Sequence, residues 1–202
     1  MNMTELRRLL IAIGYFTRLP IPARVGWSAA ELNRSARYFP LVGLLVGCAC
    51  TAALWAAAQM FPPLVAVLLS MIFGLLLTGA FHEDGLADSA DGFGGGWKKA
   101  RVLSIMKDSR IGSYGAIALI CAQLLKAGTL VSLDALALLA LPLVHALSRV
   151  PPLLIMAFMD YVREDNSARA KPVAEGLGRA EWLTGALLGL WPRWWWPGHW
   201  IG

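Results

Sequence analysis

The middle of this chain reads His82-Glu83-Asp84-Gly85-Leu86-Ala87-Asp88-Ser89-Ala90-Asp91-Gly92-Phe93-Gly94-Gly95-Gly96. Acids and glycines dominate this stretch, whereas the runs on either side of it, 64–81 and 111–133, are apolar and long enough to cross a bilayer. Charges beside a membrane are costly unless they bind something. We therefore expect the stretch to end one membrane-crossing run and to carry the chemistry.

Three aspartates in this stretch, Asp84, Asp88 and Asp91, are spaced i, i+4, i+7. If the preceding helix continues through 81–90, their carboxylates share one face, about one turn apart. Like charges at this spacing repel one another unless cations occupy the face. Oxygen ligands suit a hard ion, and Mg²⁺ is usually held by one or two carboxylates together with substrate phosphates. We predict that the aspartates bind Mg²⁺ and are catalytic, with His82 as a ligand, a base or a hydrogen-bond partner.

Glycines and bases follow the acids. The glycine-rich pattern predicts a flexible turn whose backbone N–H groups could approach an anion closely, at Gly92, Gly94, Gly95 and Gly96. The stretch is not a P-loop, because Trp97 stands where the second glycine of that motif belongs. Five bases come next: Lys98, Lys99, Arg101, Lys107 and Arg110. An acidic face that binds metal beside a basic segment that binds phosphate is the arrangement that phosphoryl transfer needs.

The composition indicates an integral membrane protein. Of the 202 residues, 57% are hydrophobic and only 15% are charged, and the mean hydropathy is +0.58. The bases behind the net charge of +5 are scattered between apolar runs, which favours membrane topology and anionic ligands over nucleic acid. Three cysteines within apolar runs are expected to be inert packing residues.

The order of apolar and charged runs predicts an all-α, polytopic helical bundle that forms one membrane domain over 1–202. Four transmembrane helices are expected, and a fifth is left open because the last apolar run is short. The segments are 1–38 (cytoplasmic or interfacial), 41–61, 64–81, 111–133 and 135–159 (transmembrane), 82–110 (motif loop) and 160–202 (cytoplasmic or interfacial tail). Excess arginine and lysine place the N-terminal segment and the motif on the cytoplasmic side. Tyr15 and Phe16 are expected at the lipid headgroups.

The fourth predicted span contains His145, Ser148 and Arg149 together with three prolines. This is too polar and too kinked for a plain lipid-facing helix, so we expect Arg149 to face the interior of the bundle. A buried polar pair of His145 and Arg149 that fixes helix packing is the alternative to substrate binding by Arg149.

The chain resembles the cobalamin synthase family, the adenosylcobinamide-GDP ribazoletransferases. The resemblance lies in 82–92 and in Ile105-Met106-Lys107-Asp108-Ser109-Arg110-Ile111-Gly112, supported by Phe16-Thr17-Arg18-Leu19-Pro20-Ile21-Pro22, Phe39-Pro40-Leu41-Val42-Gly43 and Ser148-Arg149. It implies a multi-pass enzyme of the bacterial inner membrane that joins adenosylcobinamide-GDP to alpha-ribazole, or its 5′-phosphate, with Mg²⁺ and release of GMP. The sequence leaves open whether copies form a homo-oligomer.

The resemblance also suggests a division of labour within the motif. The aspartates hold one or two Mg²⁺ ions at the pyrophosphate, while Lys107 and Arg110 clamp phosphate oxygens. Asp108 orients those bases or adds a ligand, and Ser109 belongs to the same substrate-binding turn. Gly94, Gly95 and Arg149 complete the expected substrate contacts. Solvated bases that only set the topology are the alternative for Lys107 and Arg110.

Two departures from the family pattern stand out. Glu83 occupies a position where family members commonly have an aliphatic residue, so it is either a further metal ligand or a solvated side chain. A late glycine-rich segment of the type Gly-Gly-x-Thr-Gly-Asp, usual in the family, is not in this sequence. A C-terminally truncated member is therefore one expectation, and a divergent or differently terminated one is the other.

Two rival functions remain at this point. A divalent-cation transporter would also place acids in a membrane, but near the midplane of discontinuous helices rather than at the end of a span. A CDP-alcohol phosphotransferase would carry Asp-Gly-x-x-Ala-Arg, whereas Ala87 is followed here by Asp88. Release of GMP, flux of ions or release of CMP distinguishes the three functions.

Overall fold

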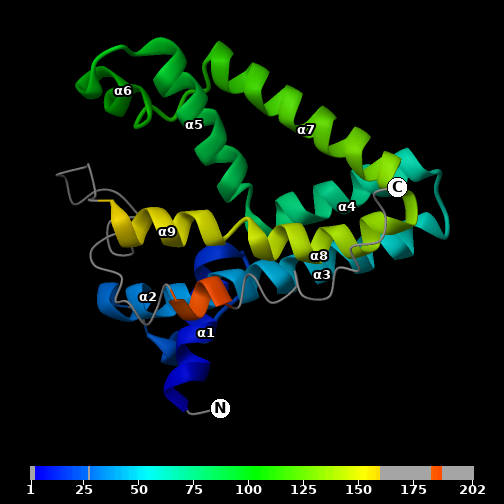
Figure 1. Cartoon of the computed structure of the whole chain (residues 1–202), viewed down its shortest axis with the longest axis horizontal. Coiled ribbons are helices and arrows are strands. Elements are labelled where there is room, and N and C mark those ends of the chain that lie inside the picture. Colours follow the sequence, from blue (N-terminus) through cyan, green and yellow to red (C-terminus); the bar gives the residue numbers. More distant parts are fainter. Residues whose placement is uncertain (1–2, 27, 160–182, 188–202) are drawn as a thin grey trace. The chain divides into compact units, whose positions relative to one another are not determined.

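The computed structural model describes residues 3–26, 28–159 and 183–187, and every regular element in these ranges is a helix (Figure 1). The elements are α1 (Met3–Phe16), η1 (Ala23–Val25), α2 (Ala29–Ser35), η2 (Ala36–Tyr38), α3 (Phe39–Ala58), α4 (Pro63–Thr78), α5 (Phe81–Gly95), α6 (Lys99–Ile105), α7 (Ser113–Leu133), η3 (Asp134–Leu136), α8 (Ala137–Leu147) and α9 (Val150–Phe158). The all-α prediction is confirmed for this part of the chain. The predicted tail, 160–202, lies outside the described residues except for 183–187.

The described residues form two compact units. The first combines the described residues of Met1–Ala52 and of Leu138–Gly202, and the second, which we call the motif unit, is Ala53–Ala137. The acidic and basic motif lies wholly within the motif unit, whereas Arg149 belongs to the first unit. The predicted single domain over 1–202 stays a prediction.

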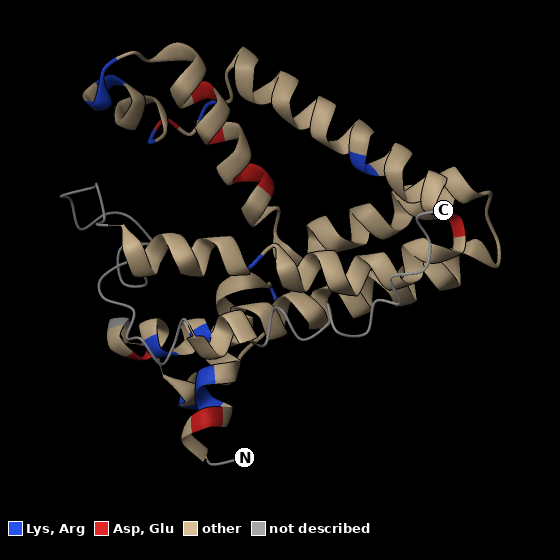
Figure 2. Cartoon of the chain, viewed as in Figure 1, with Lys and Arg blue, Asp and Glu red and all other residues tan. Residues whose placement is uncertain are grey.

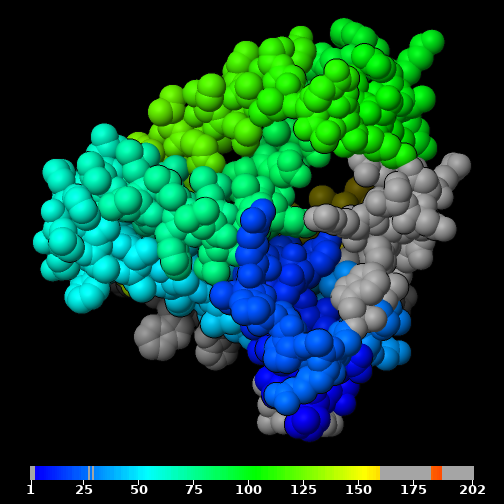
Figure 3. Space-filling model, turned by 180° about the vertical axis from the view of Figure 1, so that it is seen from behind, coloured from blue at the N-terminus to red at the C-terminus, as the bar shows by residue number. Residues whose placement is uncertain are grey.

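Two helical stretches within the described residues are long and apolar enough to cross a membrane, Ala30–Ala58 and Ser113–Phe158. The pair α4 and α5 passes the same test only when taken together, and its two helices are bent by 88°. In the motif unit, α4 and α7 expose large apolar side chains, among them Leu64, Ile72, Leu76, Leu124 and Leu125. Figure 3 shows the surface of the chain from behind, with α4 in cyan to green and α7 in green. These features agree with a helical membrane protein, while the predicted number of spans stays a prediction.

Helix α1 in the first unit packs its apolar stripe against α2 and the start of α3. Ile11 and Phe16 are buried, and the ring of Phe16 meets that of Phe39 edge-on with centroids 4.6 Å apart. The ring of Tyr15 stacks on that of Phe39 with centroids 6.0 Å apart and also meets the ring of Phe16 edge-on at 5.0 Å. The ring of Phe16 therefore packs inside the protein, and the placement of Tyr15 and Phe16 at the lipid headgroups stays a prediction.

Two glycines let α3 and α8 approach closely within the first unit. A Cβ on Gly43 would lie 2.2 Å from the carbonyl oxygen of His145, and one on Gly47 would lie 2.5 Å from the Cα of Pro142. Such glycines, four residues apart, allow backbone-to-backbone packing between apolar helices. The hydroxyl of Thr51 extends the contact by donating to the carbonyl of Leu138 at 3.1 Å.

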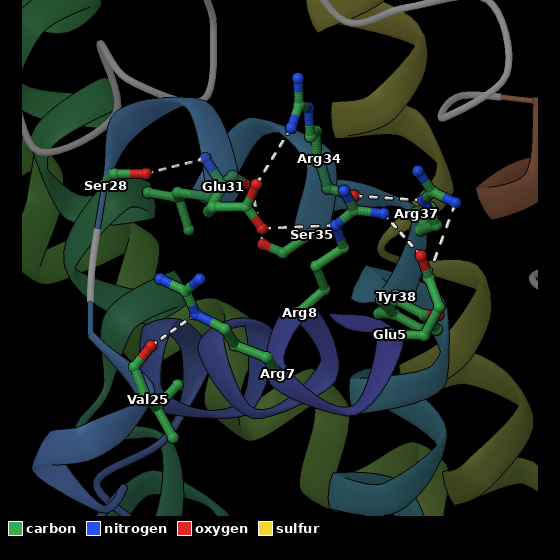
Figure 4. A network of polar contacts seen from close by, with 11 residues as sticks. Glu5, Arg7, Arg8, Val25, Ser28, Glu31, Arg34, Ser35, Arg37 and Tyr38 are labelled. Carbon is green, nitrogen blue, oxygen red and sulfur yellow. Dashed lines mark hydrogen bonds and ion pairs between the residues drawn. The ribbon is translucent and has the colours of Figure 1, made fainter. Parts of the chain in front are cut away.

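A network of charges joins α1 to α2 and η2 (Figure 4). Arg8 bridges Glu5 and Glu31, and Arg37 and the hydroxyl of Tyr38 also reach Glu5. The backbone N–H of Glu31 donates to the hydroxyl of Ser28 at 3.2 Å, which caps the start of α2. The hydrogen bond from Tyr38, with Arg37 and Arg8, lowers the pKa of Glu5 below its ordinary value of 4.5.

Substituting Gly43→Ala tests the packing of α3 on α8. The added methyl group would overlap the backbone of His145, so we expect the free energy of unfolding in detergent to fall by about 1–3 kcal/mol. Gly128→Ala is the matched control, because no heavy atom lies within 4 Å of a Cβ there. Equal stability of the two variants would contradict the close approach.

Substituting Tyr38→Phe tests the network around Glu5. A lowered pKa means that the stabilising contribution of Glu5 is present above pH 4.5 and is lost as the pH falls through the lowered value. The side chain of Glu5 is 28% exposed, so we expect Tyr38→Phe to cost roughly 1 kcal/mol at neutral pH. The free energy of unfolding of the variant should also depend less on pH below 4.5. A pH dependence identical to that of the wild type would refute this assignment.

Candidate functional site

The motif begins at a sharp break in the chain rather than as a continuation of α4. Gly79 and Ala80 both adopt left-handed backbone conformations, with φ of 66° and 57°, and the axis turns by 88° between α4 and α5. Ala80 is a non-glycine residue in this region, which is uncommon and strained. Helix α4 therefore does not continue through 81–90, the condition under which the aspartates were expected to share a face. Residues 81–95 form a separate helix, α5, within the segment predicted as a motif loop.

The three aspartates occupy one face of α5, as their spacing predicts, but their surroundings differ. Asp84 is exposed and Asp88 is half-buried, whereas Asp91 is buried, with only 9% of its surface exposed. His82 is exposed two residues before Asp84, so helix geometry places it on another face. Glu83, one residue from Asp84, is also off the aspartate face.

The glycines after the acids do not form the predicted flexible turn. Gly92, Gly94 and Gly95 belong to the last turns of α5, where their N–H groups donate within the helix. They allow close packing instead: a Cβ on Gly94 would lie 2.5 Å from the ring of Tyr114, and one on Gly92 would lie 2.8 Å from Met106. Gly94 and Gly95 were predicted to bind an anion through the N–H groups of a loop, but both residues are in α5 and not in a loop.

Asp91 joins α5 to the start of α7, where the two helices meet in Figure 1. Its carboxylate accepts hydrogen bonds from the backbone N–H of Gly112 at 2.7 Å and from that of Gly115 at 2.8 Å. Gly112 is the N-cap residue of α7, so the carboxylate satisfies N–H groups that the helix itself leaves without an acceptor. A negative charge at this end also complements the helix dipole.

Gly112 and Gly115 were not recognised as site residues from the sequence. A Cβ on either glycine would lie 2.4 Å from an oxygen of Asp91, so only glycine lets the carboxylate approach at both positions. The one signal in the sequence is the pair of glycines that flanks the start of an apolar run. Nothing in that signal identifies Asp91 as their partner.

The basic turn, residues 106–112, follows α6 and leads into α7. Figure 2 shows blue residues in and around α6, near the red residues of α5. Within the basic turn, Arg110 and Asp108 form a fork-like pair, with Nη2 to Oδ2 at 2.7 Å and Nε to Oδ1 at 3.1 Å. Donation from the Arg110 side chain and backbone lowers the pKa of Asp108 to about 2. Lys107 and Ser109 are exposed beside the pair, so the predicted phosphate-binding residues share one turn.

Among the residues that the structure describes, no three side chains of His, Cys, Asp or Glu stand where they could hold a metal ion together. The predicted cage of Asp84, Asp88, Asp91 and Glu83 is therefore not assembled. Asp84 and Asp88, one turn apart, still suit Mg²⁺, which needs only one or two carboxylates when substrate phosphates complete its shell.

Arg149 lies in the first unit, at the break between α8 and α9, with 6% of its surface exposed. Pro151 and Pro152 lack the N–H groups that would continue the helical hydrogen bonds across this break. Arg149 Nη1 donates to the carbonyl of His145 at 3.1 Å and to the hydroxyl of Ser148 at 2.6 Å. These contacts favour the alternative in which Arg149 fixes the helix packing, while substrate binding by Arg149 stays a prediction.

Substituting Arg110→Gln tests the pair in the basic turn. The lowered pKa means that the contribution of the pair is present above pH 3.8 and is lost as the pH falls through about 2. We expect the titration midpoint of Asp108, followed by the NMR shift of its carboxyl carbon, to rise from about 2 toward 3.8 in the variant. The control Arg101→Gln should leave the midpoint in place, and an equal midpoint in all three proteins would refute the pairing.

Comparison with known proteins assigns the chain to a family. Residues 8–199 match the family described as Cobalamin-5-phosphate synthase. A protein of Ralstonia nicotianae, named adenosylcobinamide-GDP ribazoletransferase, is 52% identical over 188 residues, which cover 91% of this chain and 72% of the relative. Relatives with the same name from Shewanella baltica and Shewanella frigidimarina are 49% and 46% identical, and the matches cover 70% and 68% of their lengths.

No solved structure matches this chain. The family match spans nearly all of the sequence, and the matched part includes the acidic helix α5, the basic turn and the start of α7. The chain belongs to the cobalamin-5-phosphate synthase family.

Proposed function

We propose that this protein is a transferase that joins adenosylcobinamide-GDP to alpha-ribazole, or to its 5′-phosphate, and releases GMP. The name shared by relatives about half identical to it supports this activity. The observation that carries the proposal is the tie between α5 and α7, which consists of the two hydrogen bonds from the N–H groups of Gly112 and Gly115 to Asp91. It brings an acidic helix face and the basic turn together in one unit. A metal-binding face beside a phosphate-binding turn suits the transfer of a group from a pyrophosphate.

In this proposal, Asp84 and Asp88 are the residues that would hold Mg²⁺ for the reaction of the GDP-activated substrate. When bound, the metal supplies charge stabilisation at the phosphate oxygens. Arg110 offers its guanidinium to the phosphate, and Asp108 keeps that guanidinium oriented through the fork-like pair. Lys107 adds a second positive charge from the same turn.

The proposed reaction forms one bond to phosphorus and breaks one, and it needs no reactant besides the two substrates. The hydroxyl oxygen of alpha-ribazole forms a bond to the phosphorus attached to cobinamide, and the bridging P–O bond to GMP breaks. The hydroxyl proton is released, and GMP leaves with the electron pair of the broken bond. The role of this chain is to bind and align the two substrates, which accounts for much of the catalysis of phosphoryl transfer.

We also propose that the protein is a multi-pass protein of the bacterial inner membrane with the motif on the cytoplasmic side. Arginines cluster in α1, α2 and η2, and lysines and arginines cluster in and beside α6. An excess of bases marks the cytoplasmic ends of membrane helices. The substrates would then reach the acidic face of α5 from the cytoplasm.

The proposal is tested by the release of GMP from adenosylcobinamide-GDP and alpha-ribazole by the full chain in lipid nanodiscs. Release should require Mg²⁺, stop with a chelator, and fall on the order of a hundredfold in Asp88→Asn. The control is Ser89→Ala, because the Ser89 hydroxyl only donates to the carbonyl of Gly85 in its own helix. A folded wild type that releases no GMP would overturn the activity, and release that is unchanged in Asp88→Asn would overturn the metal site.

A further inference from the structure

We infer that Asp91 is a positioning residue, and not a third metal ligand, which holds the start of α7 against α5 and so fixes the basic turn relative to Asp84 and Asp88. The inference rests on the proposed function for what this geometry is used for, but the tie itself is independent of that function. Asp84, Asp88 and Asp91 look alike in sequence, and the structure separates the last from the first two.

Both oxygens of Asp91 are already engaged. Each accepts one backbone N–H, from Gly112 at 2.7 Å and from Gly115 at 2.8 Å. The residue is also 9% exposed, whereas Mg²⁺ dehydrates reluctantly and usually keeps several waters. A hydrated ion has more room beside Asp84 and Asp88, which are exposed and half-buried.

The surroundings of Asp91 are built for this contact. A Cβ on Gly112 or on Gly115 would lie 2.4 Å from a carboxylate oxygen, and one on Gly115 would also lie 2.9 Å from the carbonyl oxygen of Ala87. Both N–H groups lie at the N-terminal end of α7, on its N-cap residue Gly112 and on the buried Gly115, where the helix itself provides no acceptor. Asp91 and two glycines, 21 and 24 residues further along the sequence, thus form a single contact.

The contact also restricts the position of the basic turn. Arg110 precedes Gly112 by two residues, and its guanidinium is held to Asp108 inside the turn. Fixing the backbone of Gly112 therefore fixes where the fork of Arg110 stands along α5. If the tie is lost, the acids and bases remain in the molecule but their alignment does not.

The first measurement follows backbone hydrogen exchange over 112–118 in the full chain in nanodiscs, without metal or substrate. Two variants break the tie differently: Asp91→Asn alters the acceptor, and Gly115→Ala crowds it while leaving the carboxylate in place. We expect exchange to rise about tenfold in both. Asp84→Asn and Gly128→Ala are matched controls on the same two helices and should match the wild type. Unchanged exchange in Asp91→Asn and Gly115→Ala would overturn the inference.

The second measurement titrates the same proteins with Mn²⁺ and counts free ion by its EPR signal. Asp84→Asn should weaken binding at least about tenfold, whereas Asp91→Asn and Gly115→Ala should stay close to the wild type. Weakened Mn²⁺ binding in Asp91→Asn with normal exchange would identify Asp91 as a ligand and overturn the inference. If Asp91→Asn does not fold, Gly115→Ala decides, with faster exchange and unchanged Mn²⁺ binding as the supporting result.

Neither measurement involves turnover, so failure of the proposed transferase activity would leave both outcomes readable. Where turnover is observed, Gly115→Ala adds a third readout. We expect it to raise KM for adenosylcobinamide-GDP about tenfold with a smaller change in kcat, because phosphate binding by the basic turn is misplaced. A fall in kcat alone would contradict this positioning role.

Discussion

The hydrogen bonds from the first turn of α7 to the carboxylate of Asp91 are the interaction on which the motif unit depends. An apolar helix that begins with unpaired N–H groups needs an acceptor, and in apolar surroundings the cost of leaving such groups unpaired is high. Asp91 supplies that acceptor from α5. As a result, the helix that carries the acids is anchored to a helix long enough to cross a membrane.

In the first unit, a charged side chain likewise pairs with backbone groups at a helix end, but at the C-terminal end of α8. The prolines after Arg149 remove N–H donors at the end of α8, and the guanidinium of Arg149 donates to the carbonyl of His145. The carboxylate of Asp91 therefore binds at a helix N-terminus in the motif unit, and the guanidinium of Arg149 binds at a helix C-terminus in the first unit. The helix dipole favours both arrangements. Charged residues in apolar helices often mark binding sites. Asp91 and Arg149, however, each form hydrogen bonds to the protein backbone.

Periodicity was sufficient to predict part of the site. The spacing of Asp84, Asp88 and Asp91 placed them on one face of a helix, and α5 is indeed helical over these positions. Long apolar runs likewise predicted an all-α fold. The break at Ala80 was not predictable, because a left-handed alanine contradicts its local preference and is imposed by the tertiary structure.

The glycine-rich segment failed as a prediction for a related reason. Glycine disfavours a helix by itself, yet Gly94 is helical because the ring of Tyr114 packs against its backbone. Periodicity also treats three equal aspartates alike. Which of them is buried depends on Gly112, 21 residues away from Asp91 in sequence, and local patterns hold no information about that partner.

The central claim is that the acidic face of α5 and the basic turn form one site. The most direct measurement places a nitroxide at Ser109, after replacement of the native cysteines, and records its EPR signal in nanodiscs as Mn²⁺ is added. We predict dipolar broadening that saturates with bound Mn²⁺ and disappears in Asp88→Asn. A nitroxide signal that bound Mn²⁺ leaves unbroadened would show that the metal and the basic turn are apart, and would contradict the claim.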